Sequence, residues 1–146
     1  MPTVRDVLAS KPTAQIHSIA PDATVLDAIK QMNQHKIGAV LVMQDNQVVG
    51  IFTERDVLRR VMAQEKAPRD VTVGSVMTED VICVQPDTDL DEVSSIMKTR
   101  RVRHVPVCGD DGKVHGMMSI GDVNAVHASN QESQIHFLSE YIYGRV

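Results

Sequence analysis

The sequence predicts an α+β fold, sandwich-like in its layers, in which two β-α-β-β-α repeats pack together and a further helix follows. The first observation is a repeated apolar pattern, in which Val40 and Val42 correspond to Val105 and Val107. The second is that the offset between the copies falls from 69 at Val4 to 65 at Pro21, stays at 65 through Val42, and becomes 66 across the turn that precedes Gly50 and Gly116. The third is that helical and extended spacing alternate in the same order in both copies. Length differences confined to loops are typical of a duplicated fold.

The first repeat occupies residues 4–64 and shows each element of this plan. Apolar residues at positions 25, 28, 29 and 32 have the i, i+3, i+4, i+7 spacing of an amphipathic helix. The apolar stretch 37–43 is typical of a strand buried on both faces, and Asp45-Asn46 favours a turn to a returning strand. The complete expected order is an extended segment at 16–19, a helix from residue 25, strands at 37–43 and 48–52, and a helix at 54–64.

A polar segment, residues 65–72, links this repeat to the second one, which occupies residues 73–128. The same reasoning applied to the second repeat predicts a second set of elements in the same order. They are an extended segment at 81–84, a helix from Leu90, strands at 102–107 and 114–118 joined by a turn at 109–112, and a helix from Ile120.

The tail, residues 130–146, predicts a final amphipathic helix, with Ile135, Leu138 and Ile142 on one stripe. Such a helix is marginal alone in water and must bury its apolar side on another surface. That surface is either its own module or, as we expect, a symmetric partner in a homodimer, because twofold pairing is the commonest closed assembly.

The composition excludes several classes of protein. With 42% hydrophobic and 23% charged residues in 146, the chain is typical of a globular protein that buries a core. A net charge of −4 and 3% aromatic residues disfavour nucleic-acid binding, and the longest apolar run is far too short to cross a membrane. Cys83 and Cys108 lie far apart in the sequence and outside any Cys-x-x-Cys motif, so we expect two reduced thiols in a cytoplasmic protein.

Both repeats close with the same short motif. It reads Gly-Ile-Phe-Thr-Glu-Arg-Asp at 50–56 and Gly-Met-Met-Ser-Ile-Gly-Asp at 116–122, and it is accompanied by Val-Met-Thr at 76–78 and Arg-His-Val-Pro-Val at 103–107. Over residues 4–128 the chain therefore resembles a tandem pair of cystathionine β-synthase (CBS) domains. The resemblance implies a regulatory module that binds adenine nucleotides in clefts between its repeats and commonly pairs into a disc-like dimer.

The resemblance assigns Thr53 and Asp56 to one nucleotide, and Ser119 and Asp122 to a second. The chemistry fits, because an ionised carboxylate accepts hydrogen bonds from the 2′ and 3′ hydroxyls of a ribose. A hydroxyl one helical turn earlier can donate to a phosphate, beside the free backbone N–H groups of a helix start. The same Ser/Thr-x-x-acid spacing is also a helix-capping pattern, as it is at Thr24, and both roles can coexist.

Positive charge is concentrated at residues 98–104 of an otherwise acidic protein. Lys98 and Arg100 suit the end of a helix, where cations offset the helix dipole. Arg103 and His104 enter a strand that we expect to be largely buried, and they are candidates for phosphate contact.

The two clefts are not expected to be equivalent, because the first repeat has Gly38 and Ala39 at the positions of Arg103 and His104. Arg55, inside the first motif, is either a further phosphate ligand or an exposed helix residue. The full set of expected ligand-binding residues is Gly38, Ala39, Thr53, Arg55, Asp56, Arg103, His104, Pro106, Ser119 and Asp122.

We expect a binding module that senses AMP, ADP, ATP or NAD and acts on an unidentified effector protein, without catalytic residues or a metal site. The six histidines lack metal-ligand spacing, and no Gly-x-Ser-x-Gly or Cys–His arrangement points to nucleophilic catalysis. The alternative is a structural dimerisation scaffold that binds no nucleotide. A third hypothesis, an enzyme or a fragment similar to the regulatory insert of IMP dehydrogenase, is disfavoured by the absence of room for a barrel.

Overall fold

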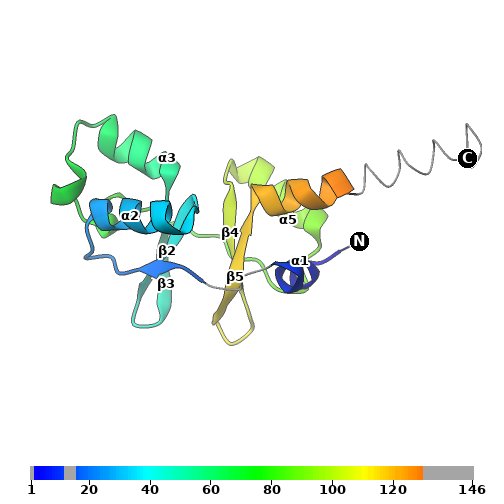
Figure 1. Ribbon diagram of the computed structural model, residues 1–146. Coiled ribbons are helices and arrows are strands. Elements are labelled where there is room, and N and C mark those ends of the chain that lie inside the picture. The colour runs from blue at the N-terminus through cyan, green and yellow to red at the C-terminus, as the bar shows by residue number, and fades with distance from the viewer. Residues whose placement is uncertain (1, 12–15, 130–146) are drawn as a thin grey trace, which may run out of the picture.

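The computed structural model describes residues 2–11 and 16–129 and shows two α+β units side by side (Figure 1). The fold class predicted from the repeats is confirmed. The predicted tail helix at 130–146 lies outside the described residues. None of the described helices is long and apolar enough to cross a membrane.

The first unit is built on a three-stranded sheet. β1 (Ser18–Ile19) pairs in parallel with β2 (Ala39–Gln44), which pairs antiparallel with β3 (Gln47–Thr53). α2 (Val25–His35) connects β1 to β2. In the hairpin turn Asp45 and Asn46 adopt left-handed backbone conformations, with φ of 53° and 64°, which short polar side chains tolerate well. The turn chemistry predicted from these two residues is therefore confirmed.

The second unit is built on the antiparallel pair of β4 (His104–Cys108) and β5 (Val114–Ser119). α5 (Leu90–Arg100) precedes β4, and a helix over residues 120–129 follows β5. The extended segment predicted at 81–84 contributes only a single parallel bridge, between Val84 and Val107.

α2 and α5 begin and end in the same way. The side chains of Thr24 and Asp89 cap the first turns by accepting backbone N–H bonds. Lys36 and Arg101 end the helices in the left-handed conformation, with φ of 55° and 56°. The residues that these helices bury also correspond, being Val25, Ala28 and Met32 in α2 and Leu90, Val93 and Met97 in α5. The helical pattern predicted from the sequence is thus confirmed in both repeats.

Each core contains a short helix from the other repeat, which the sequence pattern did not predict. α1 (Val4–Ser10) packs into the core of the second unit, and α4 (Val73–Val76) packs into the core of the first. The Val4 amide donates to the Thr88 carbonyl at 2.9 Å, and an equivalent bond of 2.8 Å holds the start of α4. The two repeats therefore interlock, since each completes the core of its neighbour.

The helix predicted at 54–64 is not a continuous α-helix. α3 (Glu54–Asp56) is a single turn that passes into a π-helix at Val57–Met62, where the Ala63 amide bonds to the Leu58 carbonyl at 2.9 Å. Apolar spacing does not specify which carbonyl an amide selects, so the sequence could not distinguish the two helix types. π-Helical turns occur frequently at functional sites.

Candidate functional site

Two clefts lie between the units, and each has one wall from each repeat. Cleft 1, of about 470 Å³, has the first closing motif on one side and residues 101–104 of the second repeat on the other. Cleft 2, of about 400 Å³, places the second motif opposite residues 36–39 of the first repeat. Because residues 36–39 correspond to 101–104, cleft 2 is the structural counterpart of cleft 1.

Asp56 is the buried carboxylate of cleft 1, with 6% of its surface exposed. Its Oδ2 atom accepts hydrogen bonds from the Thr53 amide at 3.0 Å and from the Thr53 hydroxyl at 3.2 Å. The Asp56 amide in turn donates to Thr53 Oγ1 at 3.2 Å. The two residues therefore form a capping box that starts α3.

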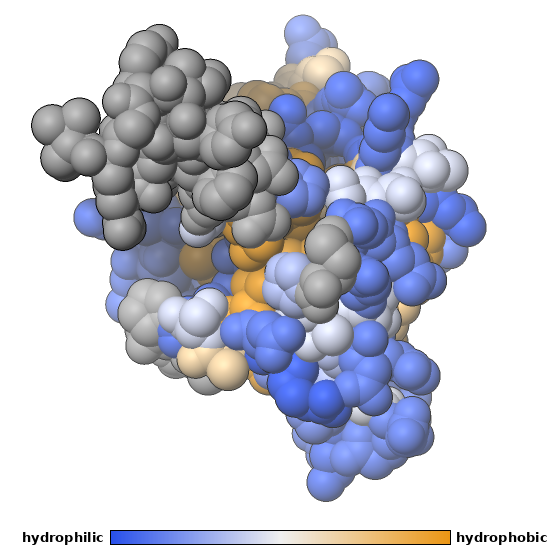
Figure 2. Space-filling model, turned by 90° about the vertical axis from the view of Figure 1, so that its right-hand side faces the viewer, coloured by the Kyte–Doolittle hydropathy of each residue, from blue (hydrophilic) through white to orange (hydrophobic). Residues whose placement is uncertain are grey.

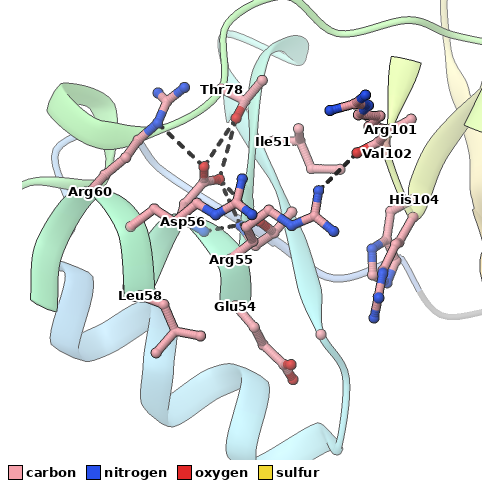
Figure 3. Close-up of a pocket in the computed structure, with 14 residues that line it drawn as sticks. Ile51, Glu54, Arg55, Asp56, Leu58, Arg60, Thr78, Arg101, Val102 and His104 are labelled. Atoms are coloured by element: carbon pink, nitrogen blue, oxygen red, sulfur yellow. Dashed lines mark hydrogen bonds and ion pairs between the residues drawn. The ribbon is translucent and has the colours of Figure 1, made fainter. Parts of the chain in front are cut away.

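The other oxygen of the Asp56 carboxylate has partners from elsewhere in the chain. Thr78 Oγ1 donates to Oδ1 at 3.2 Å, and Arg60 Nε lies 3.5 Å from the same atom (Figure 3). Arg60 also donates to the Met77 carbonyl at 2.9 Å, so it ties the π-helix to the segment after α4. Sequence reasoning missed Arg60, although its i, i+4 spacing from Asp56 is a signal that could have found it.

The wall of cleft 1 that the second repeat supplies is basic. It includes Arg101 and Arg103, and Arg55 reaches across from the first repeat to donate to the Arg101 carbonyl at 2.8 Å (Figure 3). Arg103 is exposed, which corrects the expectation of a buried strand residue, because β4 begins only at His104. The exposed guanidinium is free of the cost of burying a charge.

His104 lies at the start of β4 and lines both clefts. Burial lowers the pKa of its imidazole and outweighs the opposite effect of the Glu54 and Asp122 carboxylates. Lys11 and Arg103 act in the same direction as burial. The ring is therefore neutral at pH 7 and offers one donor and one acceptor to the space between the repeats.

Cleft 2 repeats the capping arrangement of cleft 1 with a different cation. Asp122 Oδ2 accepts a hydrogen bond from the Ser119 amide at 2.8 Å and lies 2.8 Å from Lys11 Nζ. Gly38 and Ala39 form part of the opposite wall. The expected difference between the clefts is present in the structure, because Gly38 stands in this wall where cleft 1 has Arg103, and only Lys36, the counterpart of Arg101, keeps a charge there. Lys11 carries no pattern signal in the sequence and was not anticipated.

The CBS domain family model matches residues 4–63 and 73–127, which is most of the chain. The chain belongs to the CBS domain family. It is 37% identical over 150 residues to the CBS domain-containing protein CBSX3, mitochondrial, of Arabidopsis thaliana, covering 97% of this chain and 72% of that protein. The CBS-domain containing protein ATU1752 from Agrobacterium tumefaciens has a similar solved structure, with a TM-score of 0.81 at 37% identity over 86% of this chain and 99% of that one.

A second solved structure shows what a related CBS pair binds. The CBS domain pair of protein MJ0100, in complex with 5′-methylthioadenosine and S-adenosyl-L-methionine, matches with a TM-score of 0.78 at 26% identity. The match covers 88% of this chain and 98% of that one. Both ligands of that protein contain adenosine.

Nine of the ten expected ligand-binding residues line the two clefts of this CBS pair. The tenth, Pro106, lines neither cleft, because it is buried in the middle of β4 and its carbonyl accepts the Val84 amide at 2.9 Å. The capping role of Thr53 and Asp56 is present, and their role toward a ligand stays a prediction. Within residues 2–11 and 16–129, no group of three or more His, Cys, Asp or Glu side chains could hold a metal ion.

Proposed function

We propose that this CBS pair senses an adenine nucleotide, such as AMP, ADP, ATP or NAD, in cleft 1 and thereby regulates a partner protein. The observation that carries the proposal is the buried Asp56 carboxylate facing a basic wall within one cleft. A nucleotide has the two matching groups, since its ribose hydroxyls donate hydrogen bonds and its phosphates carry negative charge.

The ribose is the part of the ligand that Asp56 would bind. Its Oδ2 atom accepts two hydrogen bonds from Thr53, at 3.0 and 3.2 Å, whereas Oδ1 accepts one from Thr78 at 3.2 Å and lies 3.5 Å from Arg60 Nε. A carboxylate oxygen has two lone pairs, so Oδ1 can accept a ribose hydroxyl when the Thr78 hydroxyl rotates away. The partners of Asp56 also hold its carboxylate in one orientation before a ligand arrives.

The phosphates would lie toward the opposite wall. Arg55 and Arg103 present planar guanidinium groups, which bind phosphate oxygens in pairs. His104 supplies a further donor, and although burial lowers the pKa of its ring, a phosphate beside it would raise that pKa. The base would lie against the apolar side chains of Ile51 and Val102, which line the same cleft (Figure 3).

A further observation supports an adenosine-containing ligand. The related pair of protein MJ0100 is solved with two adenosine-containing molecules, and the match spans nearly all of that chain. The regulated partner and the cytoplasmic location remain predictions from the sequence.

A thermal-unfolding panel tests the proposal. AMP, ADP, ATP and NAD are compared with GMP and GTP, using the wild-type chain and Asp56→Asn, which keeps the size of the side chain. A ligand at about 100 times its dissociation constant stabilises the folded state by about 2.7 kcal/mol, which raises the midpoint measurably. We expect a rise with at least one adenine nucleotide and a smaller rise in Asp56→Asn. If no adenine nucleotide raised the unfolding midpoint, the proposal would be wrong and the scaffold hypothesis would be favoured instead.

Self-association is a second function that a specific observation favours. Leu58 and Met62 of the π-helix are 65% and 53% exposed, and Leu58 also borders cleft 1. Together with the partly buried Ile29 and Ile37 nearby, they give the first unit an apolar face. We propose that a second copy of the chain covers this face in a homodimer, since large exposed side chains grouped on one face are typical of interfaces. The predicted contribution of the tail lies outside the described residues.

The second unit also presents apolar surface. Figure 2 shows an apolar patch in the middle of that unit's end face, within surroundings that are mostly hydrophilic. The partly buried side chains that pack on the core of this unit include Ile96, Ile120 and Val126. Apolar surface at both ends of the molecule is compatible with the proposed pairing.

A further inference from the structure

A groove beside cleft 1 is lined by six cationic side chains. It has a volume of about 680 Å³ and shares Arg55, Arg59, Arg101 and Arg103 with cleft 1, so the two spaces are continuous. We call it the basic groove, and its cations are Arg55, Arg59, Lys98, Arg100, Arg101 and Arg103. No Asp or Glu lines the groove within the described part of the chain, although the protein carries a net charge of −4.

The fold itself does not require this charge, because the other repeat shows the same backbone without it. α2 and α5 correspond along their length and end in the same left-handed turn. The positions equivalent to the six cations are occupied by Gly121, Ala125, Asn33, His35, Lys36 and Gly38. A helix end of this type is therefore built elsewhere in the same molecule with far fewer cations.

Contacts within the protein account for only part of the basic groove. Arg55 donates to the Arg101 carbonyl at 2.8 Å, and Arg100 lies 3.9 Å from Asp80, with both of the latter side chains largely exposed. For Arg59 and Lys98 the described residues provide no side-chain hydrogen bond or ion pair. Like charges gathered in one groove repel one another, and an anion that bridges them relieves this repulsion.

We propose that the basic groove binds the distal part of a phosphate chain that starts from a nucleotide in cleft 1. The placement of the first phosphate of the ligand rests on the proposed function of cleft 1. The predicted affinity for an oligophosphate rests only on the cations of the basic groove. Guanidinium groups on both sides of the groove match the oxygens of successive phosphates, which each carry charge. The protein should therefore distinguish nucleotides by the number of their phosphates.

Titration calorimetry with inorganic tripolyphosphate, ATP and adenosine tests this proposal. The variant is Lys98→Ala/Arg100→Ala, which removes two cations that line the basic groove but not cleft 1, and the control is Lys66→Ala/Arg69→Ala, which removes two exposed cations elsewhere. We expect the variant to bind ATP and tripolyphosphate roughly tenfold more weakly, or weaker still, because two charged contacts are lost. Its affinity for adenosine should be unchanged. The control should bind all three as the wild type does.

Each other outcome is decisive. If tripolyphosphate does not bind the wild type, or if adenosine weakens as much as ATP in the variant, the groove proposal is wrong. If a short single-stranded RNA binds more tightly than tripolyphosphate, the groove is instead a nucleic-acid surface. If tripolyphosphate binds and adenosine does not, the groove stands and the proposed nucleotide function fails.

A separate observation concerns the two cysteines. The Cys108 thiol, at the end of β4, lies 3.0 Å from the sulfur of Cys83, and Cys83 is exposed. Backbone bonds hold the two segments together, since the Cys108 amide donates to the Val84 carbonyl at 2.8 Å. The distance between the two cysteines along the sequence gave no sign of this proximity.

We infer that Cys83 and Cys108 form a reversible intramolecular disulfide in the presence of an oxidised small-molecule disulfide. The Cys83 thiolate attacks one sulfur of that disulfide and releases its first thiol, and the Cys108 thiolate then attacks Cys83 Sγ and releases the second. The two protein thiols lose two electrons and two protons, which the two released thiols carry. Burial raises the pKa of Cys108 to about 12, so the exposed Cys83 is the first nucleophile.

Alkylation and mass spectrometry test the disulfide. The full chain is incubated with oxidised glutathione, and its remaining free thiols are alkylated with iodoacetamide. Its mass is then measured with and without prior reduction and further alkylation. We expect a monomer that carries neither glutathione nor alkyl groups and that gains two alkyl groups after reduction. Cys83→Ser, the matched control, should retain one alkylated or glutathionylated sulfur. A wild-type product that carries glutathione on either cysteine, or that is linked only between chains, would show that the inference is wrong.

Discussion

Lys11 Nζ lies 2.8 Å from Asp122 Oδ2, so the acid of the second closing motif is held in a close ion pair. The corresponding acid, Asp56, has only a 3.5 Å contact with Arg60 and accepts a hydrogen bond from Thr78 instead. The duplicated motif therefore has two different electrostatic settings. A ribose that enters cleft 2 must compete with an ammonium group for the carboxylate.

This difference predicts one strong nucleotide site per chain. Calorimetric titration of the wild type should give a stoichiometry near one, with cleft 1 filled first, because Asp56 has no ion pair as close as that of Asp122 and cleft 1 carries Arg101 and Arg103 on its opposite wall. Lys11→Met, which keeps the length of the side chain, should leave cleft 1 unchanged and improve binding in cleft 2. Two equal sites in the wild type would contradict this account of the asymmetry.

Gly50 and Gly116 occupy equivalent positions but have different neighbours. A Cβ at Gly50 would lie 2.9 Å from the Thr78 carbonyl oxygen, which is backbone, whereas a Cβ at Gly116 would lie 2.9 Å from the end of the Leu8 side chain. Flexible side chains move more cheaply than backbone. Gly50→Ala should lower the free energy of unfolding by about 1–3 kcal/mol in urea denaturation, and Gly116→Ala should lower it less. Equal losses would show that the Thr78 segment is not fixed.

His104 predicts a specific pH dependence of stability. Burial holds the pKa of His104 in the folded state below the ordinary value of 6.5, which applies to the unfolded chain. Between these two pKa values, His104 is protonated in the unfolded chain but neutral in the folded one. The free energy of unfolding should therefore fall as the pH drops through 6.5 toward the lower folded-state value, and it should be regained above 6.5.

The measurement is urea denaturation of wild type and His104→Asn across about pH 5 to pH 8. The variant should lose part of the acid-induced destabilisation, and the remainder belongs to other groups such as His17, whose pKa burial also lowers. Identical pH profiles would mean that the His104 ring is not desolvated.

The exposed π-helix predicts the site of self-association. Light scattering of the wild type should give about twice the chain mass of 16.1 kDa, because a second copy covers the Leu58 face. Leu58→Glu should dissociate the dimer by placing a charge in an apolar contact. The control is Asn124→Glu, since Asn124 is exposed and is the counterpart of Leu58 in the other repeat. A monomeric wild type would contradict the homodimer.

Much of the fold followed from the sequence because the repeat shows every element twice. The apolar faces of α2 and α5 and the polar hairpin turns have local periodicities, which pattern reasoning detects. The exchange of α1 and α4 between the cores could not be found in this way. It depends on which unit each short helix packs against, and a helix of four to seven residues carries too little pattern to specify that.

The candidate site divides in the same way. The residues of the two motifs were predicted because type and spacing define the capping and acceptor chemistry, as for Thr53 and Asp56. Lys11 is an ion-pair partner of Asp122, and Thr78 is a hydrogen-bond partner of Asp56. Both come from distant parts of the sequence, and only the tertiary fold brings them to these carboxylates. The proximity of Cys83 to Cys108 likewise depends on the pairing of segments that are distant in the sequence.

The central claim, that an adenine nucleotide binds in cleft 1 at Asp56, is tested most directly by calorimetric titration of wild type and Asp56→Ala. Circular dichroism and Asp56→Asn, which can still accept the Thr53 amide, control for loss of the capping box. We predict that Asp56→Ala binds the preferred adenine nucleotide roughly 1.5–3 kcal/mol more weakly, the size of a hydrogen bond to a charged group. Unchanged affinity in a folded Asp56→Ala variant would contradict the account and leave Asp56 with a capping role alone.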